Sequence, residues 1–278
     1  MTSGGTTGAD LQLVIDAASP GDTAQVSGVC VAGFTIGRDI TLVGMATTAT
    51  PQATLDGGGL VKVLRVRGDA ATEVTLTDLT ITHGSARLLG GGIRNYAGTV
   101  TLNGSSLVSN SESGYGGGIY VASGTVVLNG SAAVSNNSAA GYSGGSIAVI
   151  TGSVALSESS TVAGNNAGES GGGGIWTQNG TVSLSDFASV TDNTARLGGG
   201  IRNDSGDLTL NGSSSVSENT ADLGGGIYSV NGDLTLNGAS SASGNSGRRG
   251  GGIYNSQNLI MNGSSSLTGN LGRRGPSL

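Results

Sequence analysis

Residues 207–232, DLTLNGSSSVSENTADLGGGIYSVNG, are one copy of a unit that recurs through most of this chain. Each copy has Gly-Gly-Gly-Ile or a close variant, a short alternating segment, and a small or branched apolar residue three positions before an asparagine. The isoleucines that end the glycine runs are Ile93, Ile119, Ile147, Ile175, Ile201, Ile227 and Ile253. They recur every 26 or 28 residues, and a period in this range is typical of stacked repeat architectures. The sequence therefore predicts a solenoid.

Three short segments of the unit have the alternation of β-strands: Leu208-Thr209-Leu210, the residues around Val216, and Gly226-Ile227-Tyr228. Clusters of Gly, Asn, Asp and Ser separate them and favour tight turns with positive φ. No part of the unit has the composition of a helix. We therefore predict an all-β fold, a right-handed parallel β-helix in which coils stack at ~4.8 Å.

Stacking places equivalent residues in columns along the solenoid. The predicted inward columns are the seven isoleucines; Val100, Val126, Val154, Val182, Leu208, Leu234 and Leu259; and Leu102, Leu128, Leu156, Leu184, Leu210, Leu236 and Met261. Two asparagine ladders are predicted: Asn110, Asn137, Asn165, Asn193, Asn219, Asn245 and Asn270; and Asn103, Asn129, Asn211, Asn237 and Asn262, interrupted by Ser157 and Ser185. We interpret both ladders as structural, because stacked amides bond to one another and to the backbone of corners.

A single domain of about ten coils is predicted over residues 1–278. Residues 1–23 form an N-terminal cap with a short helix over Asp10–Ala18, capped by Asp10. Residues 24–89 form less regular coils, 90–270 the seven repeats, and 271–278 an uncapped tail.

The composition excludes several classes of protein. The formal net charge is −6 and charged residues make up 11%, which disfavours nucleic acid binding. No apolar run approaches the ~20 residues of a membrane-spanning helix, and the first residues lack the pattern of a signal peptide. Cys30 is the single cysteine, so we expect no internal disulfide and interpret it as a small buried hydrophobe. No motif indicates a cofactor.

Two stretches resemble known bacterial proteins. Residues 11–26, with Asp16-Ala17-Ala18-Ser19-Pro20-Gly21-Asp22-Thr23, resemble the opening of secreted β-helix proteins of the pectate-lyase-like superfamily. The glycine–isoleucine repeats resemble the polymorphic outer membrane protein repeat, which pairs Gly-Gly-x-Ile with Phe-x-x-Asn. Here the second motif reads Val216-Ser217-Glu218-Asn219, and valine, leucine or alanine replaces phenylalanine in every copy. The resemblance implies an extracellular or cell-surface protein, often adhesive, and it carries over no catalytic residue.

The residue after each repeat isoleucine is predicted to face outward. In the later coils this column contains Trp176, Arg202, Tyr228 and Tyr254, which we predict as a ligand-binding stripe for a glycan. The alternative is that these residues only pack against one another across strands. A second exposed column, Arg196, Asp222 and Arg248, alternates in charge.

Two acidic pairs are expected on neighbouring coils. Asp207 over Asp233 is the candidate acid and nucleophile pair, and Asp192 over Glu218 is the candidate Ca²⁺ site. We favour solvated surface charges for both pairs, and so assign neither a catalytic residue nor a metal site. His83 lacks the flanking motif of pectin-cleaving enzymes and is interpreted as a surface residue.

The predicted function is a non-enzymatic extracellular or cell-surface β-helix, an adhesin-like or structural module whose partner is a polysaccharide or a host-surface glycan. The alternative is a polysaccharide lyase or hydrolase with a degenerate acidic site. An ice-binding threonine array fits Thr99 and Thr101 but is interrupted by Asp207 and Asn258.

The C-terminal tail is expected to leave the last coil uncovered. We predict a mostly monomeric rod with end-to-end contacts at this face, opposed by Pro276 and by the pairs Arg248-Arg249 and Arg273-Arg274.

Overall fold

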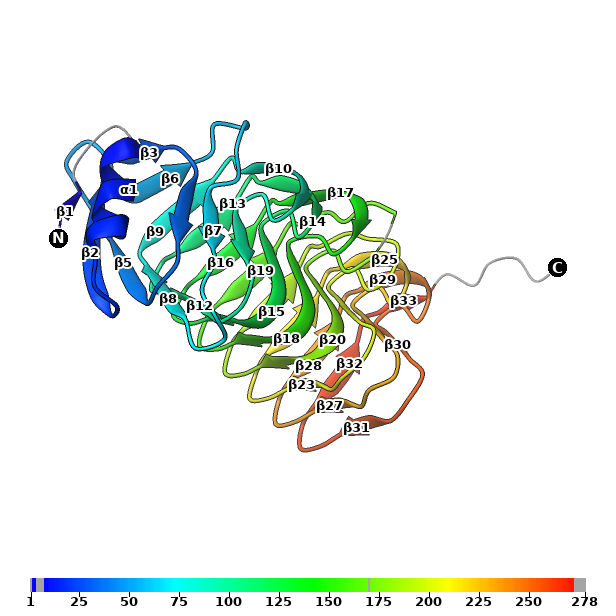
Figure 1. Cartoon of the computed structure of the whole chain (residues 1–278). Coiled ribbons are helices and arrows are strands. Elements are labelled where there is room, and N and C mark those ends of the chain that lie inside the picture. The colour runs from blue at the N-terminus through cyan, green and yellow to red at the C-terminus, as the bar shows by residue number, and fades with distance from the viewer. Residues whose placement is uncertain (1, 4–7, 170, 273–278) are drawn as a thin grey trace.

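The computed structural model describes residues 2–3, 8–169 and 171–272, and these form a parallel β-solenoid of about nine turns (Figure 1). In the described residues, nine coil-to-coil pairings join the ten strands of one side. The predicted all-β parallel solenoid is therefore confirmed, with about nine turns. Residues 273–278, which include Arg273, Arg274 and Pro276, lie outside the described residues.

The strands that the structure describes form three sides of the solenoid. Sheet A, with 17 strands, contains β1 (Thr2–Ser3), β2 (Asp22–Ser27), β4 (Phe34–Ile36), β5 (Ile40–Met45), β7 (Leu64–Val66), β8 (Glu73–Thr77), β11 (Ile93–Asn95), β12 (Thr99–Asn103), β15 (Ile119–Leu128), β18 (Ile147–Leu156), β20 (Ile175–Leu184), β22 (Ile201–Asn203), β23 (Leu208–Leu210), β26 (Ile227–Ser229), β27 (Leu234–Leu236), β30 (Ile253–Asn255) and β31 (Leu259–Met261). Sheet B, with ten, contains β3 (Val29–Val31), β6 (Ala53–Asp56), β9 (Leu79–Thr82), β13 (Leu107–Ser109), β16 (Ala133–Ser135), β19 (Thr161–Ala163), β21 (Ser189–Thr191), β24 (Ser215–Ser217), β28 (Ser241–Ser243) and β32 (Ser266–Thr268). The third side consists of β10 (Ser85–Leu89), β14 (Glu112–Tyr115) and β17 (Ser138–Ser143), and separately of β25 (Thr220–Leu223), β29 (Ser246–Arg249) and β33 (Leu271–Gly272).

The predicted unit is confirmed and gains a fourth segment. The expected strands correspond to β23, β24 and β26, and both β23 and β26 lie in sheet A on either side of a bend. The added segment is β25, which forms the third side together with β29. In β15, β18 and β20 the two segments of sheet A merge into continuous strands of ten residues.

The predicted inward columns stack in register. Ile201 pairs with Ile227, and Leu208 pairs with Leu234. The column residues are buried through most of the solenoid, where each large apolar side chain contributes roughly 1.5–3 kcal/mol. The exceptions lie in the last coil, over which no described coil packs: Ile253 is partly buried, and Leu259 and Met261 are 40% and 41% exposed.

One asparagine ladder fills the corner between sheet B and the third side. Each amide bonds to the next along Asn137, Asn165, Asn193, Asn219, Asn245 and Asn270. The prediction was wrong for Asn110, because the pairing of Ser109 with Ser135 aligns Ser111, not Asn110, with Asn137. Ser111 donates its N–H to the Asn137 amide oxygen and so extends the ladder by its backbone.

Asn219 shows what each ladder residue does. Its Oδ1 accepts from the backbone N–H and the side-chain Nδ2 of Asn193, while its Nδ2 donates to the carbonyl of Val190 at 2.9 Å. It is fully buried, so backbone groups that would otherwise lack partners are satisfied inside the corner. The glycine run makes the room: a Cβ on Gly200 would lie 2.9 Å from the Asn219 Nδ2.

The second predicted ladder is confirmed on the more exposed corner. Asn129 donates to Asn103, Asn237 to Asn211, and Asn262 to Asn237. Ser157 continues the ladder, because its hydroxyl donates to the Asn129 amide oxygen at 2.7 Å.

The N-terminal helix α1 (Gly8–Ala17) covers the first coil. It begins before Asp10, which therefore lies in the first turn rather than at the cap. Leu11 and Ile15 are buried, and the Gln12 amide exchanges two hydrogen bonds with the backbone of Thr35. The helix thus covers the N-terminal end of the solenoid, which would otherwise be exposed to solvent.

The less regular coils of residues 24–89 follow the same path. The alternating run over residues 74–81 is two strands, β8 and β9, because Asp78 has a φ of 53° and turns the chain between sheets A and B. Cys30 is buried as predicted, and burial raises the pKa of its thiol. Among the described residues no helix is both long and apolar enough to cross a membrane.

We predict that Asn219→Ala lowers the free energy of unfolding by at least about 2 kcal/mol, because several buried groups lose partners at roughly 1–3 kcal/mol each. The matched control is Asn237→Ala on the half-buried ladder, where water replaces the lost bonds and the loss stays below about 1 kcal/mol. Urea unfolding of both variants checks this. Equal losses would show that the buried ladder is not the stronger element.

Candidate functional site

The predicted outward column exists on sheet A. Pairing places Trp176 beside Arg202, Arg202 beside Tyr228, and Tyr228 beside Tyr254. The same column continues toward the N-terminus through Ala148, Tyr120, Arg94 and Arg65. Chemically different side chains therefore follow one another along a single face.

Trp176 was expected to be exposed, but it is buried, with only 6% of its surface accessible. It packs with Tyr120 and Ala148 in a second apolar cluster on the outer surface of sheet A. Leu89 and Tyr115 cover this cluster from β10 and β14, and the Tyr115 and Trp176 ring centroids lie 6.1 Å apart. The third-side strands of earlier coils thus fold over the column, which the repeat pattern does not encode.

Asp204 joins two members of the column. The Trp176 indole Nε1 donates to its Oδ2 at 2.8 Å, and the Arg202 Nε donates to its Oδ1 at 2.7 Å. Both side chains of the ion pair are about four-fifths buried. The shared carboxylate fixes the indole and the guanidinium, so this part of the surface is preorganised.

Tyr228 and Tyr254 form the C-terminal part of the column. Their rings are stacked, with centroids 5.2 Å apart and an interplanar angle of 9°. Tyr254 is 37% exposed, so this is where the column presents aromatic surface to solvent.

A pocket of about 460 Å³ opens beside Trp176. Its apolar wall consists of Leu89, Tyr115, Tyr120, Ile150 and Trp176, and its polar groups are Gln178 and Asp204. Burial raises the pKa of the Tyr120 phenol, which therefore stays neutral and able to donate. An aromatic cavity with a few placed polar groups is the usual form of a small-ligand site.

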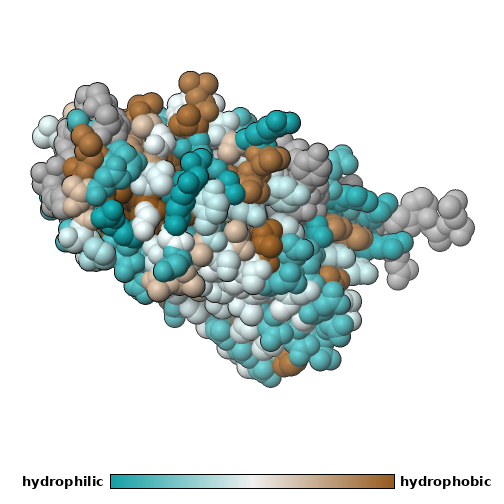
Figure 2. All heavy atoms as spheres, viewed as in Figure 1, coloured by the Kyte–Doolittle hydropathy of each residue, from teal (hydrophilic) through white to brown (hydrophobic). Residues whose placement is uncertain are grey.

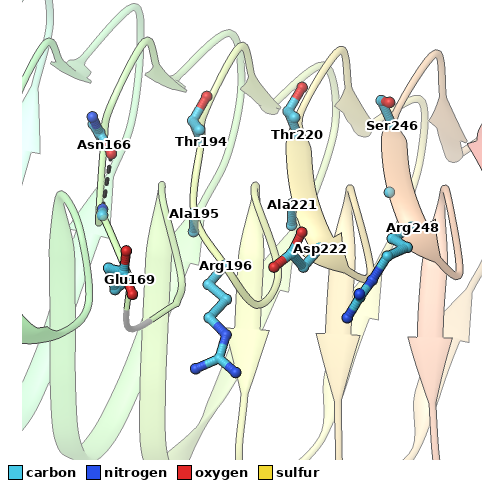
Figure 3. Close-up of a pocket in the computed structure, with 12 residues that line it drawn as sticks. Asn166, Glu169, Thr194, Ala195, Arg196, Thr220, Ala221, Asp222, Ser246 and Arg248 are labelled. Atoms are coloured by element: carbon cyan, nitrogen blue, oxygen red, sulfur yellow. Dashed lines mark hydrogen bonds between the residues drawn. The ribbon is translucent and has the colours of Figure 1, made fainter. Parts of the chain in front are cut away.

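A larger groove of about 830 Å³ runs across the later coils on the third side (Figure 3). One wall carries the polar residues Asn166, Thr194, Thr220 and Ser246, and the other carries Arg196, Asp222 and Arg248. Ala195 and Ala221 line the groove between them. Among the residues that the structure describes, no ion pair joins the charged wall and no aromatic side chain lines the groove.

The acidic pair consists of Asp207, which comes directly before β23, and Asp233, which comes directly before β27 after one turn of chain. The Asp233 backbone N–H donates to the Asp207 Oδ1 at 3.1 Å, and the Asn258 amide donates to the Asp233 Oδ1 at 2.9 Å. Each carboxylate thus accepts a hydrogen bond from the following coil, as Asn103 and Asn211 of the more exposed ladder do.

Asp192 and Glu218 occupy corner positions. Both have a positive φ, of 56° and 57°, at the place where other coils have Asn136 or Gly164. Within the described ranges, no three His, Cys, Asp or Glu side chains gather closely enough to hold a metal ion. His83 also lies at a corner, 3.3 Å from Asp56.

Several residues of the pocket were not found from the sequence. Tyr120 lies in the same outward column as Trp176, two coils earlier, so following the column further toward the N-terminus indicates it. Asp204 follows Arg202 by two residues, and alternate residues of a strand lie on the same face, so this spacing indicates Asp204. Leu89 and Tyr115 come from the non-repeating parts of other coils, and no pattern in the sequence indicates them.

Comparisons with protein-family models, with curated proteins and with solved structures found no match to this chain.

We predict that the single tryptophan is poorly accessible to acrylamide, and that Tyr115→Ala increases its quenching by removing part of its cover. Tyr254→Ala, three coils further along the same column, is the matched control and leaves quenching unchanged. Stern–Volmer titration measures both. Strong quenching of the wild-type protein would contradict the covered position of Trp176.

Proposed function

We propose that this chain is a non-enzymatic carbohydrate-binding β-solenoid. The observation that carries the proposal is the aromatic pocket beside Trp176, at the head of the column that continues to Arg202, Tyr228 and Tyr254. Sugars present apolar ring faces and many hydroxyl groups. Aromatic walls with a carboxylate and an amide at the rim offer a partner for each.

The column extends the proposed site along the solenoid axis. Arg202 and the stacked tyrosines lie on successive coils, so a glycan chain longer than the pocket would continue over repeated contacts. The rigid shape of stacked coils supports this role, because a binding surface held by strands needs little ordering when a ligand arrives.

The non-enzymatic part of the proposal rests on the acidic residues. Asp207 and Asp233 are engaged in cross-coil hydrogen bonds and line neither the pocket beside Trp176 nor the groove on the third side. The proposed location is the cell surface or the extracellular medium, and the resemblance of the repeats to adhesive surface proteins supports it.

Titration of the protein with a panel of neutral and acidic oligosaccharides tests the proposal, with Trp176 emission as the signal. We expect a saturable change with at least one glycan. Gln178→Ala and Asp204→Asn should each weaken binding by roughly tenfold, the effect of one lost polar contact. Phe187→Ala, an exposed aromatic on a corner outside the pocket, is the control and should bind as the wild type does.

No emission change with any glycan, or unchanged affinity in both pocket variants, would remove the proposal. Product analysis in the same samples addresses catalysis. Cleavage that is lost in Asp207→Asn or Asp233→Asn would replace a binding function by an enzymatic one.

A further inference from the structure

Four basic side chains gather over β7 and β11 in a protein of net charge −6: Lys62, Arg65, Arg67 and Arg94. Arg65 and Arg94 are direct neighbours on adjacent coils. Figure 2 shows hydrophilic side chains gathered on this face, where Figure 1 places β7. Like charges at one coil spacing repel each other, so their placement requires an explanation.

Among the described residues, the cluster has no acidic ion-pair partner. The ion pairs of Arg202 with Asp204 and of His83 with Asp56 include no residue of the cluster. The Nε atoms of Arg65 and Arg94 are buried and lack any hydrogen-bond partner. A buried donor of a charged group that lacks a partner is costly, and native structures rarely keep one without a reason.

Tyr96 holds the guanidinium groups in place. The Arg94 guanidinium lies 4.1 Å from the centre of the Tyr96 ring and that of Arg67 lies 5.6 Å from it. These contacts orient the arginines without neutralising them.

Lys62 reports the positive field of the cluster. Burial, followed by the charges of Arg94, Arg65 and Arg67, lowers the pKa of its ammonium group from 10.5 to about 8. The ammonium form is therefore less stable here than in an ordinary lysine, and a nearby anion would raise the pKa again.

We infer that Lys62, Arg65, Arg67 and Arg94 form a binding site for a tetrahedral oxyanion, a sulfate or phosphate group. Three guanidinium groups and an ammonium group, gathered without an ion-pair partner among the described residues, match a doubly charged acceptor with several oxygens. A chloride ion offers no such set of directed acceptors. The inference goes beyond the proposed glycan pocket and uses none of its residues.

Calorimetric titration with sodium sulfate and with sodium phosphate, at ionic strength held constant with sodium chloride, tests the site. We expect one binding event per chain. Arg65→Gln and Arg94→Gln should each weaken it by roughly tenfold or more, the effect of losing a charge-assisted hydrogen bond. Arg248→Gln, an exposed arginine of the groove on the third side, is the matched control and should leave binding unchanged.

The pH dependence gives a second readout. Lys62 loses its proton as pH rises through about 8, so sulfate affinity should fall between pH 7 and pH 9. Lys62→Met should remove this dependence. Stability without sulfate should rise over the same range, because the unfolded chain, with an ordinary lysine pKa of 10.5, holds the proton longer than the folded chain does.

A third arm distinguishes a free anion from a group carried on a sugar. N-acetylglucosamine 6-sulfate should bind more tightly than inorganic sulfate if the group is part of a glycan, and equally if the site takes the free anion. Unsulfated N-acetylglucosamine should not bind at this site. Both results require the arginines, so either one supports the oxyanion site.

Circular dichroism checks that each variant folds. If Arg65→Gln or Arg94→Gln does not fold, Arg67→Gln replaces it, because Arg67 is exposed and its substitution does not disturb the core. No heat from sulfate, phosphate or the sulfated sugar above that of chloride would overturn the inference. Binding of equal strength in the arginine variants would overturn it as well. Because inorganic sulfate tests the site without Gln178, failure here and failure of the glycan pocket are separate results.

Discussion

The in-register stacking of each coil on the next is the constraint on which the rest of this structure depends. One coil buries too few side chains to be stable by itself, so the core exists only as columns such as that of Ile201 and Ile227. Main-chain hydrogen bonds permit stacking in several registers. The buried amide ladder through Asn193 and Asn219 selects one of them, because a slip by one residue would leave the amides and the corner backbone without partners.

The same register organises the outer surface. A position that points outward in one coil does so in the next, so the sequence of side chains along one column divides a uniform rod into regions. Arg65 and Arg94 create a cationic region, and Tyr120 and Trp176 create an aromatic one beside it. The third side departs from strict repetition, and there Leu89 and Tyr115 reach over the column and turn a flat face into a pocket.

Most of the fold follows from residues that repeat. The isoleucine columns, the strands of the unit and the exposed ladder were predictable because period-two alternation and a fixed repeat length specify them independently. The position of Asn110 was not predictable, since Asn136 and Asn137 both offer a partner and only strand pairing decides between them. The strand β25, with sequence Thr220-Ala221-Asp222-Leu223, lacks the composition of a strand and forms because its neighbours on the stack pair with it.

The site was less predictable than the fold. Its column was found from the repeat, whereas the burial of Trp176 depends on side chains more than 50 positions away in the sequence. The basic cluster lies in the irregular coils, where no period aligned Arg65 with Arg94 before the strands were known. Functional residues that do not follow the repeat can therefore be located only once the register of the strands is known.

Removal of one whole coil tests the central claim most directly. Deletion of residues 194–219 joins Asn193 to Thr220 and keeps every column in register, since these asparagines are 26 positions apart. Deletion of residues 194–206, half of that segment, joins Asn193 to Asp207 and interrupts every column at the junction. We expect the first variant to keep its β-sheet circular dichroism and cooperative unfolding in urea, and the second to lose both. Equal loss in the two variants would contradict a fold that is specified by coil-to-coil register.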